Sequence, residues 1–100
     1  MPTYISLLRY TEEGIRTLKQ RHDFYFEPNK NVFLPALGVK IKQIFLVLGE
    51  YDAVAVLEAP DDEAVARAAL YLGRVGTVRT QTMRAFTEEE SSKIIDGLPD

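Results

Sequence analysis

Residues 39–59 read VKIKQIFLVLGEYDAVAVLEA, and this stretch decides the fold. Val39 to Leu48 begins with lysines that alternate with apolar residues and ends almost wholly apolar, so it predicts a β-strand. Ala53 to Ala59 predicts a second strand that is nearly all apolar. The tetrapeptide Gly49–Asp52 separates them and is short enough for an antiparallel hairpin. We expect both strands to be buried and to form the centre of a sheet.

Two more strands are predicted near the ends of the chain. Thr3 to Tyr10 is rich in the aromatic, aliphatic and hydroxyl residues that strands tolerate. Val78 to Phe86 has a mixed pattern. One of its faces carries Val78, Thr80, Thr82, Arg84 and Phe86.

Two helices have clear start signals. Pro60 to Glu63 supplies an N-cap and an acidic first turn, and Gly73 or Gly76 can end the helix that follows. Thr87 and Glu90 have the spacing of a capping box, in which each side chain bonds the other residue's backbone amide. This predicts a final helix after the last strand.

Residues 21–38 are the least regular part of the chain. A first helix begins at Thr11, which is followed by two acids, and we expect it to be short. The apolar triple Phe24–Phe26 follows, and then Pro28 and Pro35, which break helix interiors. We therefore expect two short pieces here and not one long helix.

The element order predicts an α+β fold of ferredoxin-like βαββαβ type, formed by residues 1–100 as a single domain with an extra C-terminal helix. Such a fold has a four-stranded antiparallel sheet with two helices on one face. The other face stays open, and apolar central strands would make it a large exposed apolar patch. We expect a homodimer or a larger homo-oligomer through this open sheet face.

Composition argues against several classes of protein. The net charge is −3, which disfavours a general nucleic-acid binder. There is no cysteine and only one histidine, so neither a thiolate metal site nor a histidine cluster is predicted. The longest apolar run falls far short of the roughly 20 residues of a membrane span. With no visible signal peptide, we expect a cytoplasmic protein that needs no metal and no cofactor.

Five segments together resemble the GYD domain family. They are residues 3–7 (TYISL), 49–52 (GEYD), 58–63 (EAPDDE), 78–82 (VRTQT) and 84–87 (RAFT). The resemblance covers the chain outside residues 21–37. It implies a dimeric α/β-barrel fold and a family of small prokaryotic proteins, and it implies no reaction.

A candidate ligand-binding set comes from the first and last strands and the hairpin turn. Because these two strands lie near each other in the ferredoxin-like order, their polar groups can converge on a small anionic or polar ligand. The alternative is that they form the polar part of a subunit interface. In the turn, Glu50, Tyr51 and Asp52 offer acid/base and hydrogen-bonding groups, or serve only to shape the hairpin. The set is Tyr4, Ser6, Tyr51, Asp52, Thr80, Thr82 and Arg84.

Other chemistry-bearing residues have simpler interpretations. His22 is a possible general base or an ordinary surface histidine. The aromatic triple Phe24–Phe26 is either a lid over an apolar ligand or plain packing. The acids at 61–63 and 88–90 are interpreted as helix-start residues and not as metal ligands.

Two hypotheses of function follow. The first is an oligomeric small-molecule-binding or assembly module, because no catalytic motif is present. The second is a cofactor-free monooxygenase or isomerase that acts on a small aromatic or polyketide-like substrate, which rests on fold analogy. The sequence leaves open whether the protein is an enzyme.

Overall fold

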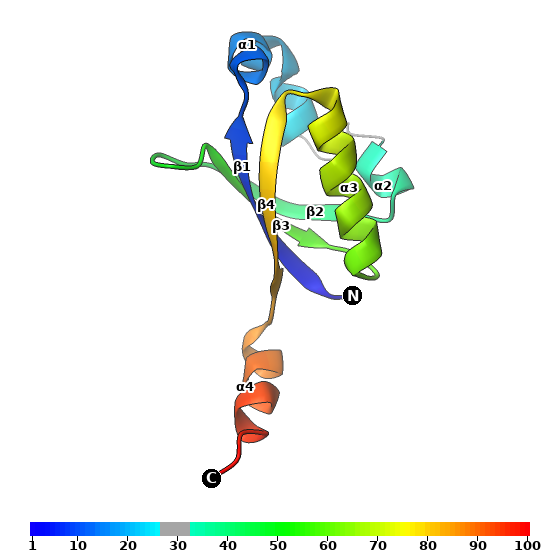
Figure 1. Cartoon of the computed structure of the whole chain (residues 1–100), viewed down its shortest axis with the longest axis vertical. Helices are drawn as coiled ribbons and strands as arrows, with labels where there is room; N and C mark the ends of the chain where they lie inside the picture. Colours follow the sequence, from blue (N-terminus) through cyan, green and yellow to red (C-terminus); the bar gives the residue numbers. More distant parts are fainter. Residues whose placement is uncertain (27–32) are drawn as a thin grey trace.

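The computed structural model describes the backbone of residues 1–26 and 33–100 and the side chains of residues 1–20 and 35–100. Four strands form one antiparallel sheet in the order β2-β3-β1-β4 (Figure 1). The strands are β1 (Thr3–Tyr10), β2 (Lys40–Leu46), β3 (Ala53–Glu58) and β4 (Val78–Ala85). The helices are α1 (Glu12–Phe26), α2 (Phe33–Ala36), α3 (Asp62–Val75) and α4 (Glu88–Asp96). The predicted α+β fold with a four-stranded antiparallel sheet is confirmed.

The hairpin of β2 and β3 is not the centre of the sheet, so that prediction was wrong. β1 and β3 lie inside, and β2 is an edge strand. Its apolar second half is largely exposed, with Phe45 at 52% and Leu46 at 66%. The reason is topological. In this fold each crossover helix joins two strands that have another strand between them, which places the first and third strands inside.

The first helix is longer than predicted. α1 runs from Glu12 to Phe26, so the aromatic triple Phe24–Phe26 belongs to its C-terminal end. The hydroxyl of Thr11 accepts a hydrogen bond from the amide of Gly14 at 3.1 Å, as expected of an N-cap. The expectation of a short helix failed because the first helix-breaking proline, Pro28, comes only after Phe26. α2 is the separate second piece.

The core lies between the sheet and α3. Alternate residues of β1 are buried on this side, and β3 contributes Ala53, Ala55 and Leu57. α3 packs against them with Val65 and Ala68, and its alanines allow close approach. The helix begins as predicted, because Asp61 accepts a hydrogen bond from the amide of Ala64 at 2.9 Å. It ends at Gly76 and not at Gly73, since Gly76 has the positive φ of 89° that a helix end of this type requires.

The opposite side of the sheet, which we term the open face, carries two rows of paired residues. Strand register places Leu7, Val54 and Phe45 side by side across three strands. The second row joins Met83, Ile5 and Val56. The open face is thus defined by Ile5, Leu7, Phe45, Val54, Val56 and Met83. Phe45 is 52% exposed and Met83 40% exposed, and the other four are half-buried.

Helix α4 projects away from the sheet (Figure 1) and gives the chain extents of 53 × 31 × 20 Å. The predicted capping box is present. The Thr87 hydroxyl accepts from the Glu90 amide at 3.2 Å, and the Glu90 carboxylate accepts from the Thr87 amide at 2.9 Å. The helix buries none of its residues. Its stability within this chain therefore depends on local interactions.

The capping box allows a direct test of this dependence. We expect Thr87→Ala to cost α4 about 1 kcal/mol, because the Glu90 amide loses its acceptor. Amide exchange in α4 should then become roughly fivefold faster, while exchange in the sheet stays unchanged. Hydrogen exchange followed by mass spectrometry measures both. Ser92→Ala, an exposed change within the same helix that leaves the cap intact, should instead slow exchange slightly, because alanine has a higher helix propensity than serine. Equal acceleration in the sheet would show that α4 supports the fold after all.

A candidate ligand cleft between α3 and strands β1 and β4

Five of the seven candidate residues gather on the side of the sheet that faces α3. Strand register sets Tyr4 opposite Arg84 and Ser6 opposite Thr82, and the alternation brings Thr80 to the same side. Between these strands and α3 lies a cleft of about 370 Å³. Its lining consists of Tyr4, Asp62, Val65, Ala66, Ala69, Thr80, Thr82 and Arg84. The prediction that the first and last strands bring polar groups together therefore agrees with the register.

The mouth of the cleft carries a hydrogen-bonded pair. Tyr4 is only 3% exposed, and its hydroxyl donates to the carboxylate of Asp62 at 2.5 Å. This hydrogen bond, and then burial, raises the pKa of the Tyr4 phenol above its ordinary value. The phenol therefore stays protonated at neutral pH and holds Asp62 at the edge of the cleft.

Arg84 closes another side of the mouth. Its guanidinium lies 5.7 Å from the centre of the Tyr4 ring and 4.6 Å from that of Phe86. It donates to the carbonyl of Thr3 at 3.0 Å and to the Glu90 carboxylate at 3.2 Å. It also donates to the carbonyl of Ala85. The capping bond from Thr87, and then Arg84, lower the pKa of the Glu90 carboxyl. The charge of Arg84 is thus offset by an acid from α4.

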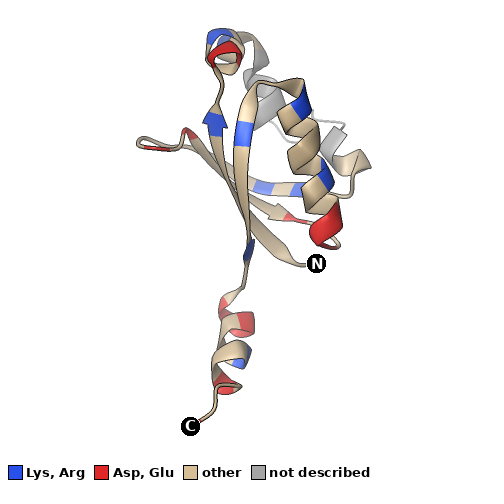
Figure 2. Cartoon of the chain, in the orientation of Figure 1, with Lys and Arg blue, Asp and Glu red and all other residues tan. Residues whose placement is uncertain are grey.

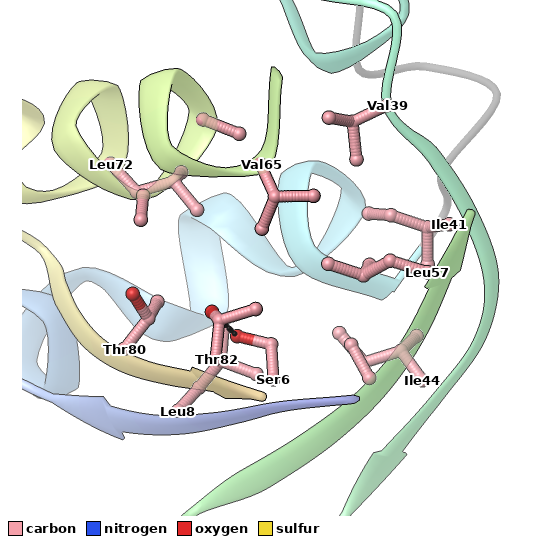
Figure 3. Close-up of a pocket in the computed structure, with 13 residues that line it drawn as sticks. Ser6, Leu8, Val39, Ile41, Ile44, Leu57, Val65, Leu72, Thr80 and Thr82 are labelled. Carbon is pink, nitrogen blue, oxygen red and sulfur yellow. Dashed lines mark hydrogen bonds between the residues drawn. The ribbon is translucent and has the colours of Figure 1, made fainter. Parts of the chain in front are cut away.

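The cleft continues inward into an apolar cavity of about 40 Å³ beneath α3 (Figure 3). Val65, Ala69, Thr80 and Thr82 line both spaces. Within the cavity the hydroxyls of Ser6 and Thr82 are 3.0 Å apart and hydrogen-bonded. The remaining lining is aliphatic and includes Leu8, Val39, Ile41, Ile44, Leu57 and Leu72. The site as a whole is polar at its mouth and apolar inside.

The structure does not bring Tyr51 and Asp52 to this cleft. Tyr51 lies on the other side of the sheet, where its hydroxyl donates to Gln81 at 2.5 Å. Asp52 ties the hairpin turn to β1, because its carboxylate accepts from the amide of Tyr10 at 2.8 Å. Glu50 likewise pairs with Arg9 at 3.2 Å. These contacts are those of a turn held against β1.

Asp62 is the site residue that sequence reasoning missed. It was interpreted only as one of three acids at a helix start, and it does lie in the first turn of α3. The signal that could have found it is Tyr4, because a buried tyrosine hydroxyl needs a hydrogen-bond partner. Nothing local selects that partner, since the two residues are 58 positions apart. The side chains of His22 and of Phe24–Phe26 lie outside the described residues.

The Tyr4–Asp62 bond predicts a pH dependence of stability. The pKa of the Tyr4 phenol is higher in the folded state than its unfolded value of about 10. The stability that this bond contributes is therefore fully present below pH 10. The contribution is lost as the pH rises from there through the raised folded-state pKa. We expect Tyr4→Phe to cost about 1 kcal/mol at neutral pH. Urea unfolding between about pH 9 and 12 should show a shallower loss of stability for this variant than for wild type. Parallel pH profiles would contradict the assignment.

No helix in the described part of the chain is long and apolar enough to cross a membrane. Among the same residues, no group of three or more histidines, aspartates and glutamates is placed to hold a metal ion.

Comparison with known proteins gives three findings. Residues 4–95 match the GYD domain family. A Thermus thermophilus protein named glutamine synthetase and cystathionine beta-lyase binding protein is 40% identical over 86 residues, which cover 86% of this chain and 90% of that protein. The crystal structure of FFRP-DM1 superposes with a TM-score of 0.57 at 19% identity, covering 86% of this chain and all of that one. The last likeness concerns the fold alone.

Proposed function

This chain is a member of the GYD domain family. We propose that it is a homo-oligomeric binding module that associates with glutamine synthetase, cystathionine β-lyase or both. The observation that carries the proposal is the 40% identical relative, whose name states that it binds these two enzymes. The similarity spans 90% of that protein, so it is not confined to a single motif.

The open face supports self-association. Its apolar residues form a contiguous patch across all four strands, and charged residues flank it. Beyond one end of the patch, Arg9 and Arg79 face each other on β1 and β4. At the other end, the Lys42 ammonium lies 3.7 Å from the Glu58 carboxylate. An apolar centre with a charged rim is the usual anatomy of a protein interface. Two copies packed face to face would remove this patch from water with closed two-fold symmetry.

Helix α4 supports binding to another protein. Its two isoleucines and the leucine just beyond its end are exposed, with Ile94 at 51%, Ile95 at 62% and Leu98 at 65%. Acids outnumber bases on the helix, as Figure 2 shows. A projecting amphipathic helix of this kind fits a groove with an apolar floor and basic rims. The partner surface on the enzyme should therefore have that chemistry.

The test is co-elution of the purified full chain with glutamine synthetase and with cystathionine β-lyase from the same organism in size-exclusion chromatography. We expect the chain to shift into the fraction of at least one enzyme. The double variant Ile94→Glu and Ile95→Glu should lose the shift, because it places charges on the apolar side of α4. Leu70→Glu is the matched control, since Leu70 is 75% exposed and lies on α3, which is well separated from α4 (Figure 1). Failure of both enzymes to retain wild type would refute the proposal.

The cleft beneath α3 favours a binding role over the alternative of a cofactor-free enzyme. Tyr4 donates to Asp62 and Arg84 pairs with Glu90, so among these groups only the exposed Asp62 carboxylate has room for a further partner. A general acid or base has to be available to a substrate. The same arrangement is compatible with a ligand that is held without being changed.

A further inference from the structure

The cleft beneath α3 has the size and the polarity of a small-molecule site. Its volume of about 370 Å³ falls at the lower end of the roughly 300–1,000 Å³ that is usual for ligand pockets. The inner cavity of about 40 Å³ has room for about three waters, or for a branched alkyl group of similar size. Its walls are aliphatic, so an alkyl group is the better occupant.

Charge at the mouth decides which polar group the ligand carries. Arg84 is offset by Glu90 at 3.2 Å, so this pair contributes no net charge. Tyr4 is a neutral donor and binds Oδ1 of Asp62. Asp62 lines the cleft and is itself exposed, so its carboxylate can still accept from a ligand. The charge that remains at the mouth is therefore negative. It comes from Asp62, which lines the cleft, and from its neighbour Asp61, which is close enough to act on Tyr4.

Hydroxyls line the path between the mouth and the apolar cavity. Thr80 and Thr82 border both spaces, and Ser6 borders the inner one (Figure 3). The oxygens of these hydroxyls can accept hydrogen bonds from a cationic group of the ligand that also reaches Asp62. A ligand that carries only a carboxylate would instead be repelled, because it has the same sign of charge as Asp62.

From this arrangement we propose that the cleft binds a small compound with an ammonium group on a short branched aliphatic chain. The ammonium binds Asp62 at the mouth, and the alkyl end enters the cavity formed by Leu8, Ile44, Leu57 and Leu72. Simple amines and amino acids share this chemistry. The inference does not depend on the proposed protein partner.

Three probes with the same alkyl group test the proposal by isothermal titration calorimetry. L-leucine carries both charges, 3-methylbutylamine only the ammonium and 4-methylpentanoate only the carboxylate. We expect at least one of the two ammonium compounds to bind at least tenfold more tightly than 4-methylpentanoate. Binding of leucine alone identifies an amino acid as the ligand, and binding of the amine alone identifies a simple amine. Absence of binding by both, or equal binding of the carboxylate, overturns the proposal.

Variants locate the site. Asp62→Asn keeps an acceptor for Tyr4 but removes the charge, and should weaken the ammonium compounds at least tenfold. Glu63→Gln removes the same charge one residue along, from a side chain that pairs with Arg67 at 3.4 Å and does not line the cleft. The affinity of the Glu63→Gln variant for the ammonium compounds should stay within twofold of wild type. Ala69→Leu fills the space common to cleft and cavity and should abolish binding. Equal effects of the two acid-to-amide changes would show nonspecific charge attraction and refute the site.

Discussion

An alanine at position 14 is expected to destabilise the protein by about 3–5 kcal/mol, a large share of the roughly 5–15 kcal/mol that holds a small domain folded. A Cβ built on Gly14 would lie 1.9 Å from the carbonyl oxygen of Thr77. The carbonyl belongs to the backbone and the Cβ position is fixed by its own Cα, so no side-chain rotation can relieve the contact. The start of α1 and the turn before β4 would have to separate.

That separation would break specific hydrogen bonds. The amide of Thr11 donates to the Thr77 carbonyl at 3.1 Å, and the Thr11 hydroxyl donates to the Gly76 carbonyl at 2.7 Å. For a chain of this size, the melting temperature should fall on the order of 15–30 °C. Thermal unfolding followed by circular dichroism measures it.

Gly73→Ala is the matched control. Gly73 also lies in a helix, and the nearest atom to an added Cβ is the Arg79 guanidinium at 3.6 Å, an ordinary contact. Alanine should stabilise α3 here by about 0.5–1 kcal/mol through its higher helix propensity. The same substitution should therefore have opposite signs in the two helices. A Gly14→Ala variant as stable as wild type would contradict the contact with Thr77.

Replacing Val54 by glutamate is expected to convert the proposed dimer into a folded monomer. Val54 lies between Leu7 and Phe45 in the middle of the open face. In a face-to-face dimer each copy would bury an unpaired carboxylate at a cost on the order of 3–5 kcal/mol, which is about 6–10 kcal/mol for the dimer. The dissociation constant should therefore rise by roughly four orders of magnitude or more. In the monomer the glutamate reaches water, so the fold should survive.

Sedimentation equilibrium over a range of micromolar concentrations measures this change. Phe45→Glu, in the same row, should act in the same direction, and Leu70→Glu on the outside of α3 should leave association unchanged. Far-ultraviolet circular dichroism checks that each variant is folded. A wild-type chain that stays monomeric across the range would remove the basis for self-association, and a dimeric Val54→Glu would place the interface elsewhere.

The sequence by itself determined the elements whose signals are local. β1 occupies the predicted Thr3–Tyr10, and α4 begins with the predicted capping box. Periodicity, caps and turn residues act over a few positions, so they can be read without knowing the rest of the chain. The closeness of the polar groups on β1 and β4 was also predicted, because it requires only the fold class and the alternation of strand residues. The pairing of Tyr4 with Arg84 came from the register of the two strands in the structure.

Only the tertiary structure decided what depends on distant neighbours. β2 is an edge strand because β1, from the start of the chain, pairs with the other side of β3 and leaves β2 with β3 as its one partner. Asp62 became part of a cleft because the fold brings it to a tyrosine 58 residues away. Gly14 is the sharpest case. Helix propensity alone favours alanine at this position. Alanine is excluded because tertiary packing places the Thr77 carbonyl where its Cβ would be.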